Sequence, residues 1–183
     1  MSNNRDRPVF AYQSSIPREI LHVVTSFYRL WEMPETPDAV TGLFNPDGVL
    51  HILDPPVTGQ GNIRQFRARM VELLPLVEAR FYPNKLYLLA QEADGGAVSG
   101  DKDTSDEKTG TTGEVMVDGR WIGLLHGGQE VSTDFVDLFV MSRAKDGSEE
   151  LKLDLVRSFW DTSKMAGAVF SVIGDRKLDE GET

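Results

Sequence analysis

Residues 131–160 read VSTDFVDLFVMSRAKDGSEELKLDLVRSFW, and this stretch decides the fold class of the chain. Branched and aromatic residues dominate 131–143 and 149–160, as is typical of strands. The segment between them, AKDGS, has the composition of a tight turn. We therefore expect an antiparallel hairpin, with strands at 131–143 and 149–160.

More strands precede this hairpin. Residues 114–126 form one expected strand, and residues 77–82 and 85–91 form two more, separated by Pro83 and Asn84. The intervening stretch 92–113, EADGGAVSGDKDTSDEKTGTTG, has almost no apolar residues and cannot bury itself. We interpret it as a long flexible loop inserted in a hairpin.

The N-terminal half is helical by pattern. Ser15 offers an N-cap for a helix that ends at Met33, before Pro34. Its apolar residues recur at helical spacing. They are Ile20, Val23, Val24, Phe27 and Trp31.

A short helix opening at residues 36–38, a turn at 45–48 and a strand at 49–53 come next. A third helix follows residues 59–62. Its apolar stripe is Ile63, Phe66, Met70, Leu73 and Leu74. The basic residues Arg64, Arg67 and Arg69 are interpreted as a solvated helix face.

This order of elements predicts an α+β fold. We expect a cone-shaped barrel, in which a curved antiparallel sheet wraps around the long N-terminal helix and leaves a ligand-sized cavity. The expected organisation is an N-terminal arm at 1–14, one domain at 15–162 with the insertion 92–113, and a tail at 163–183. The weakly apolar segment 166–173 of that tail could pack on the sheet or on a second subunit.

Composition excludes several classes. The formal net charge of -10, from 29 acidic and 19 basic residues, argues against nucleic-acid and anionic-membrane partners. The absence of cysteine excludes disulfides, thiolate metal sites and a cysteine nucleophile. The polar N-terminus lacks an apolar signal core and no apolar run could span a membrane, so we expect a cytoplasmic protein. The histidines are far apart in sequence, and no metal site is predicted.

Three stretches carry a family resemblance: FYRLWEMPETPDAVTGLF (27–44), GVLHILDPPVTGQGNIRQF (48–66) and DLFVMSRAKDGSEELKLDLVRSFWD (137–161). They resemble the first helices, the Asp-Pro corner with its following helix, and the terminal hairpin of the nuclear transport factor 2-like superfamily. Within it, the chain resembles the SnoaL-like polyketide cyclases. The resemblance implies the cone fold with its pocket, and a homodimer formed through the sheet face.

Asp137 is the foremost candidate for catalysis. It lies on an apolar strand face with Phe135, Phe139 and Met141, where a carboxylate is costly unless it is paired or functional. Burial would raise its pKa toward the range useful for proton transfer. The alternative is a buried salt bridge with Arg157 or Arg80.

His51 and His126 are candidate acid–base groups. His51 alternates with Leu50 and Ile52, so it is either a satisfied core histidine or a base in the cone. His126 ends the expected strand 114–126, shares a face with Ile122 and Leu124 and precedes two glycines, and we expect it near the pocket. His22 is interpreted as structural or exposed.

Arg157 and Asp154 lie on opposite faces of the last strand by simple alternation, and we favour Arg157 as the one that points inward. It could stabilise an oxyanion, as could Arg80. Asp54 either caps a turn or faces the mouth of the cone. The predicted substrate-binding residues are Tyr28, Trp31, Asp54, Arg80, Tyr82, Trp121 and Phe139.

The predicted function is cofactor-independent proton transfer on a small apolar natural product in secondary metabolism: isomerisation, cyclisation or dehydration. Asp137 or His51 would take the proton and His126 would return it, while Arg157 or Tyr28 would stabilise the oxyanion. One alternative is a non-catalytic binding or dimerisation module. Another is an epoxide hydrolase that uses Asp137, Arg157 and Asp154.

Overall fold

The computed structural model describes residues 16–33, 35–74, 76–90, 113–126, 128–145 and 147–161, with positions 163 and 167. The predicted N-terminal arm, nearly all of the insertion 92–113 and most of the tail lie outside the described residues. None of the described helices is long and apolar enough to cross a membrane.

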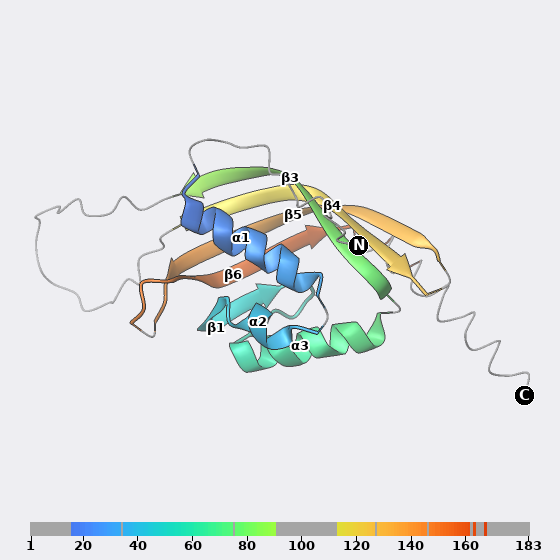
Figure 1. Ribbon diagram of the computed structural model, residues 1–183, viewed down its shortest axis with the longest axis horizontal. Helices are drawn as coiled ribbons and strands as arrows, with labels where there is room; N and C mark the ends of the chain where they lie inside the picture. Colours follow the sequence, from blue (N-terminus) through green and yellow to red (C-terminus); the bar gives the residue numbers. More distant parts are fainter. Residues whose placement is uncertain are drawn as a thin grey trace, which may run out of the picture.

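Six strands form one curved sheet in the order β2-β1-β6-β5-β4-β3 (Figure 1). Their bounds are β1 (Phe44–His51), β2 (Val57–Thr58), β3 (Leu76–Ala90), β4 (Gly113–Leu125), β5 (Glu130–Arg143) and β6 (Leu151–Trp160). The predicted hairpin is confirmed, because β5 and β6 pair antiparallel with Asp137 opposite Ser158. The expected α+β fold with a curved sheet is likewise confirmed.

The sheet is mixed rather than wholly antiparallel. Strand β1 pairs parallel with β6, with His51 opposite Arg157, and the other pairings are antiparallel. The turn predicted at 45–48 is wrong, since these residues belong to β1. The register of β1 against β6 shifts between Phe44 and Val49, which lets the Asn-Pro-Asp-Gly segment stay within an irregular strand.

Strand β3 is continuous through Pro83, so the two strands predicted at 77–82 and 85–91 are one. It lies at the edge of the sheet, where a residue without an N–H can be accommodated. Its register against β4 shifts between Leu76 and Glu78, between Pro83 and Lys85, and between Leu88 and Ala90. Proline therefore bends this strand without ending it.

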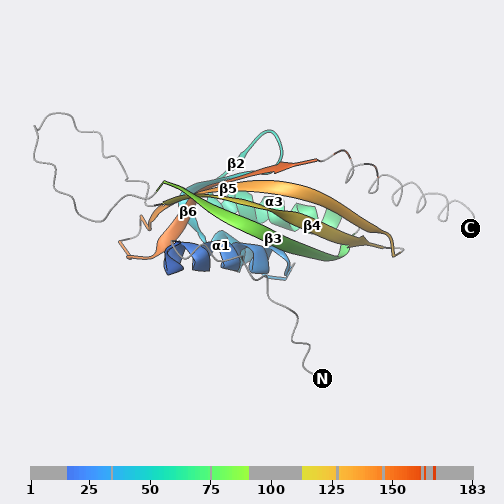
Figure 2. The same cartoon turned by 90° about the horizontal axis from the view of Figure 1, so that it is seen from above.

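The first helix, α1 (Arg18–Trp31), lies along the sheet as expected (Figures 1 and 2). All of its predicted apolar face is buried, from Ile20 to Trp31. Helix α3 (Gln60–Leu73) lies beside β1, and α2 (Pro37–Thr41) contacts α1 and α3. The core between α1 and the sheet is mainly aromatic, with Phe27, Tyr28, Phe44, Phe81, Phe135 and Phe139 all at most 4% exposed.

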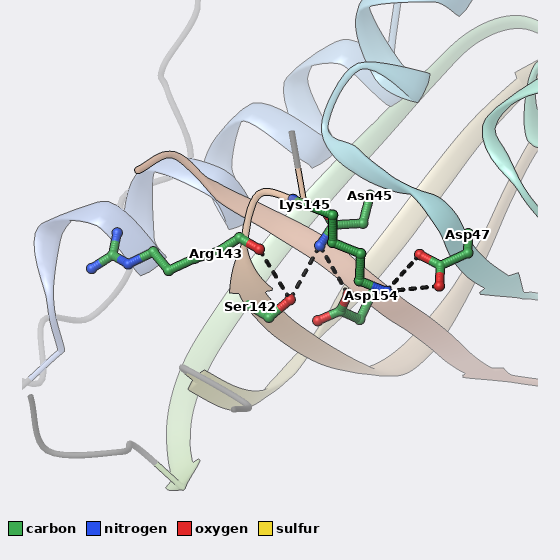
Figure 3. Close-up of polar contacts among 6 residues, drawn as sticks. All are labelled: Asn45, Asp47, Ser142, Arg143, Lys145 and Asp154. Carbon is green, nitrogen blue, oxygen red and sulfur yellow. Dashed lines mark hydrogen bonds and ion pairs between the residues drawn. The ribbon is translucent and has the colours of Figure 1, made fainter. Parts of the chain in front are cut away.

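A polar group, here called the Asn45 cluster, joins β1 to the β5–β6 hairpin (Figure 3). It consists of Asn45, Asp47, Ser142, Lys145 and Asp154. The Asn45 amide donates to Ser142 Oγ at 3.1 Å and to Asp154 Oδ1 at 2.9 Å. Its oxygen accepts the Lys145 backbone N–H at 3.2 Å, and the Lys145 ammonium pairs with Asp47 at 2.7 Å. Asn45 is 1% exposed, so these bonds satisfy a buried amide.

Candidate active site

Asp137 lies inside the cone, on β5, and is 1% exposed. The Tyr28 hydroxyl, from α1, donates a hydrogen bond to Asp137 Oδ2 at 2.8 Å. The predicted salt bridge to Arg157 or Arg80 is wrong, because the partner of the carboxyl is this tyrosine. The helix and the central strand thus hold an acid and a phenol together in an aromatic core.

Burial raises the pKa of Asp137 to about 6. The nearby polar groups of Ser158, Tyr28 and Trp160 oppose this rise, since each favours the charged carboxylate. Burial, reinforced by the Asp137 charge, raises the pKa of Tyr28 well above its usual value. Near neutral pH the carboxyl can therefore exchange a proton, whereas the tyrosine remains a hydrogen-bond donor.

The second oxygen of the Asp137 carboxyl can still accept a hydrogen bond. Among the described residues, Asp137 Oδ1 has no hydrogen-bond partner, and neither has Trp160 Nε1. The indole N–H lies close enough to lower the pKa of Asp137 but does not reach bonding geometry. Because buried polar atoms are normally satisfied, this orphaned pair marks a place where a ligand or a water could bind.

A cavity of about 140 Å³ has Trp160 in its wall, while Asp137 lies behind that ring and does not line the cavity. The end of α1, helix α3, the start of β3 and the ends of β4 and β6 enclose it, and its walls are mostly apolar. Residues on its wall include Trp31, Arg67, Met70, Leu74, Trp121 and Trp160. Trp160 therefore borders the cavity on one side and the Asp137 carboxyl on the other.

Arg67 is the most unexpected residue in the cavity wall. It is 7% exposed, it stacks over the Trp31 ring at 4.8 Å from the centroid, and it donates to the Trp31 carbonyl oxygen. Its Nε has no partner among the described residues. The prediction that Arg67 lies on a solvated face is wrong: it is four residues after Ile63, so both point to the buried side of α3.

Two acidic side chains also line the cavity, and both are engaged. Glu32 Oε1 accepts the Phe81 backbone N–H at 2.7 Å. Glu78 pairs with Arg80, whose NH2 nitrogen lies 2.7 Å from Glu78 Oε1. Neither carboxylate is within ion-pair distance of Arg67.

The predicted site residues divide between the inside and the outside of the cone. Tyr28 and Phe139 lie in the core, while Trp31 and Trp121 line the cavity. Tyr82 is 43% exposed, and Arg80 lies at the surface beside Glu78. The structure brings Asp137 together with Tyr28 and Trp160 and keeps Arg80 and Tyr82 apart from them.

The histidines do not join Asp137. His51 Nε2 lies 2.7 Å from Asp54 Oδ1, and both residues line an open groove of about 550 Å³ with Arg157. This groove adjoins the cavity, because Ile52, Leu53 and Trp160 line both. His126 is exposed, one residue beyond the end of β4. The expectation that His126 lies at the pocket is wrong because the histidine falls on the face of Ile122 and Leu124, which is the outer face of the sheet, whereas Leu125 faces the core.

Arg157 also points away from the cone. The register shift between Val140 and Met141 breaks simple alternation on β6, so Leu153 and Val156 both face the core. Arg157 is consequently exposed and stacks on Phe159 at 4.9 Å from the ring centroid. With Asp154 held in the Asn45 cluster, the set proposed for epoxide hydrolysis is not assembled.

Within the described part of the chain, no group of three or more histidine and acidic side chains is placed to hold a metal ion.

No family model and no curated protein matches the sequence. Solved structures do match the fold. A candidate aromatic ring hydroxylase from Novosphingobium aromaticivorans superposes with a TM-score of 0.60 at 16% identity, over 78% of this chain and 87% of that chain. Nuclear transport factor 2 from Cryptosporidium parvum gives 0.51 at 16% identity, over 77% and 90%.

A hexachlorocyclohexane dehydrochlorinase of type 2 gives a TM-score of 0.54 at 14% identity, over 78% of this chain and 85% of that chain. The predicted resemblance is thereby confirmed at the level of the fold: the chain has the nuclear transport factor 2-like cone. The SnoaL-like subgroup remains a prediction.

Proposed function

We propose that this protein is an enzyme that moves a proton within a small, largely apolar substrate, with Asp137 as the catalytic acid–base. The observation that carries the proposal is the buried Asp137 carboxyl, whose pKa lies at about 6 and whose Oδ1 is unpartnered. A carboxyl with such a pKa can both accept and return a proton near neutral pH.

The reaction we propose is a proton shift next to a carbonyl group. The ionised carboxylate removes a proton from the adjacent carbon, and the electron pair of the broken C–H bond delocalises onto the carbonyl oxygen as an enolate. In a β,γ-unsaturated ketone the enolate is conjugated with the C=C bond, so the protonated Asp137 can return its proton to the γ-carbon. The carbonyl re-forms and the C=C bond moves from the β,γ to the α,β position, which completes an isomerisation. Tyr28 holds Oδ2 by its hydrogen bond and so directs the unpartnered Oδ1.

Access from the cavity runs past Trp160. Its ring borders the cavity and its N–H faces the carboxyl, so a change in its side-chain torsions would open one to the other. A dry, aromatic surrounding strengthens the electrostatic interactions between the carboxyl and the reacting atoms. Similarity of fold to a dehydrochlorinase, whose reaction removes a proton, supports the proposal by analogy.

The test uses small cyclic β,γ-unsaturated ketones in D₂O, with loss of the α-proton signal followed by NMR. Wild-type protein should accelerate exchange, and Asp137→Asn should reduce the rate at least about 100-fold. Asp134→Asn, which alters an exposed carboxylate three residues earlier on β5, is the matched control. Exchange that persists in Asp137→Asn would refute the assignment.

A non-catalytic binding module is the second candidate. Its support is that the rings of Phe81, Phe135 and Trp160 pack against one another, and that the histidines lie outside the cone. In that case ketones would bind, as reported by protein fluorescence, yet their protons would exchange at the uncatalysed rate.

We further propose that a second copy of the chain covers the outer sheet face, as the family resemblance implies. Half-buried apolar side chains recur there on β4 and β5, and Phe159 on β6 is 50% exposed. Sedimentation should show a dimer, and Leu138→Glu at this face should give a folded monomer. A wild-type monomer would contradict this proposal.

A further inference from the structure

Proton transfer at Asp137 does not explain why Arg67 is buried in the cavity wall. The residue is only 7% exposed and lies in an apolar cavity wall, and among the described residues no carboxylate is within ion-pair distance of its guanidinium. Burial lowers its pKa, an effect that Glu35 opposes. A buried cation with an unpartnered N–H is costly, and an anion at the cavity would offset that cost.

Of the charged side chains at the cavity, Arg67 is the one placed to bind an anion. Glu32 accepts a backbone N–H and Glu78 is paired with Arg80. Arg67 itself uses one nitrogen for the Trp31 carbonyl, which fixes the guanidinium plane against the Trp31 ring and leaves Nε unpartnered. A planar guanidinium held in this way favours a carboxylate oxygen as its next acceptor.

The rest of the cavity wall favours a ligand with a flat, apolar part. All three tryptophans of the chain, Trp31, Trp121 and Trp160, contribute to its wall. The rings of Trp121 and Trp160 lie 5.7 Å apart with a 39° tilt. The volume of about 140 Å³ is close to that of an engineered cavity, on the order of 150 Å³, which binds benzene.

We propose that the cavity binds a small organic acid with a flat apolar body, whose carboxylate pairs with the Arg67 guanidinium. Such an acid would be the substrate only if the proposed function is correct, and in this respect the inference rests on that function. A ligand anchored at Arg67 extends along the cavity toward Trp160 and Asp137. Arg67 is then a specificity-determining residue, since it selects acids over neutral analogues.

The experiment titrates the full chain with benzoate, benzamide and acetate and records tryptophan fluorescence. Benzoate carries both a ring and a carboxylate, whereas benzamide lacks the charge and acetate lacks the ring. Benzoate should give a saturable change and bind at least about tenfold more tightly than either analogue. Equal binding of benzoate and benzamide would overturn the proposal.

Two variants test whether Arg67 is the residue that binds the carboxylate. Arg67→Met keeps the apolar stem of the side chain and should weaken benzoate binding at least about tenfold while leaving benzamide binding unchanged. Arg69→Met, at an exposed position of the same helix, should leave both unchanged. Retention of benzoate affinity in Arg67→Met, with the fold verified by circular dichroism, would also overturn the proposal.

This test is independent of the one for proton transfer. Benzoate has no proton to shift next to a ketone, so its binding is measured whether or not Asp137 is catalytic. Selective benzoate binding without ketone exchange would leave an acid-binding protein. Ketone exchange without selective benzoate binding would support the proposed enzyme and refute the proposal that its ligand is an organic acid.

Discussion

Two groups of buried polar side chains, the Asn45 cluster and the set formed by Asp137, Trp160 and Arg67, differ in how completely their atoms are partnered. In the first, the Asn45 amide uses both of its N–H groups and its oxygen within the protein. In the second, Asp137 Oδ1, Trp160 Nε1 and Arg67 Nε have no partner among the described residues. A satisfied network stabilises a fold, whereas an unsatisfied one bordering a cavity is held ready for a ligand.

The largest effect on stability is expected at the centre of the satisfied cluster. Asn45→Ala removes three hydrogen bonds and leaves buried partners unpaired, so the free energy of unfolding should fall by about 4 kcal/mol. Urea denaturation measures this loss. Asn62→Ala, which removes only an exposed bond to the Thr58 carbonyl, is the control. A similar loss in both variants would mean that the cluster is unimportant.

The next effect concerns Asp137 and depends on pH. Its pKa is about 6 in the folded protein against 3.8 for the free side chain, so the native state binds the proton more tightly. Its stabilising contribution is thus present at low pH and is lost as pH rises from about 4 through 6, by up to about 3 kcal/mol.

Asp137→Asn should remove this dependence of the free energy of unfolding on pH. The variant should therefore gain stability relative to the wild type as pH rises. Urea denaturation at several pH values between 4 and 8 measures it. Asp134→Asn should keep the wild-type slope. An unchanged slope in Asp137→Asn would show that the buried carboxyl is not the titrating group.

A smaller effect is expected at Arg67. Because the guanidinium is desolvated and incompletely partnered, Arg67→Met should change the free energy of unfolding by less than about 1 kcal/mol. Thermal and urea denaturation measure it, with Arg69→Met as the control. A loss as large as that of Asn45→Ala would place Arg67 among the structural residues and erase the contrast between the two groups.

The smallest effect belongs to the exposed edge of the Asn45 cluster. Lys145 lowers the pKa of Asp47 by its hydrogen bond, so the pair stabilises the protein above the usual aspartate pKa and this contribution is lost as pH falls. Asp47→Asn should cost less than about 1 kcal/mol at pH 7 and less still at pH 3, by urea denaturation. A cost that grows on acidification would contradict the assignment.

Local patterns in the sequence were sufficient for the main elements. The apolar spacing of α1 and the alternation in β5 predict both sides of the core, and the apolar neighbours of Asp137 predict its burial. Periodicity could also have found Arg67, since Ile63, Arg67 and Met70 recur at i, i+4 and i+7. The charge of Arg67 favours an exposed position instead, which is why the pattern alone does not decide its burial.

Other features depend on tertiary pairing and leave no local signal. The register shift opposite β6 turns Arg157 outward, and a one-residue slip of this kind reverses every later side chain. The parallel pairing of β1 with β6 joins segments about 100 residues apart. The partners of Asn45 and the Tyr28–Asp137 bond likewise depend on which elements meet in space.

Strand β3 has a consequence for the behaviour of the protein in concentrated solution. Among the described strands it has a neighbour on one side only, and the backbone groups of such an edge could recruit strands from other molecules. Glu32 accepts one of its N–H groups, that of Phe81. Pro83 removes one donor from that strand, and three register shifts along it interrupt a regular ladder. The long strand is thereby a poor template for fibril growth, which protects an otherwise open sheet from self-association along that border.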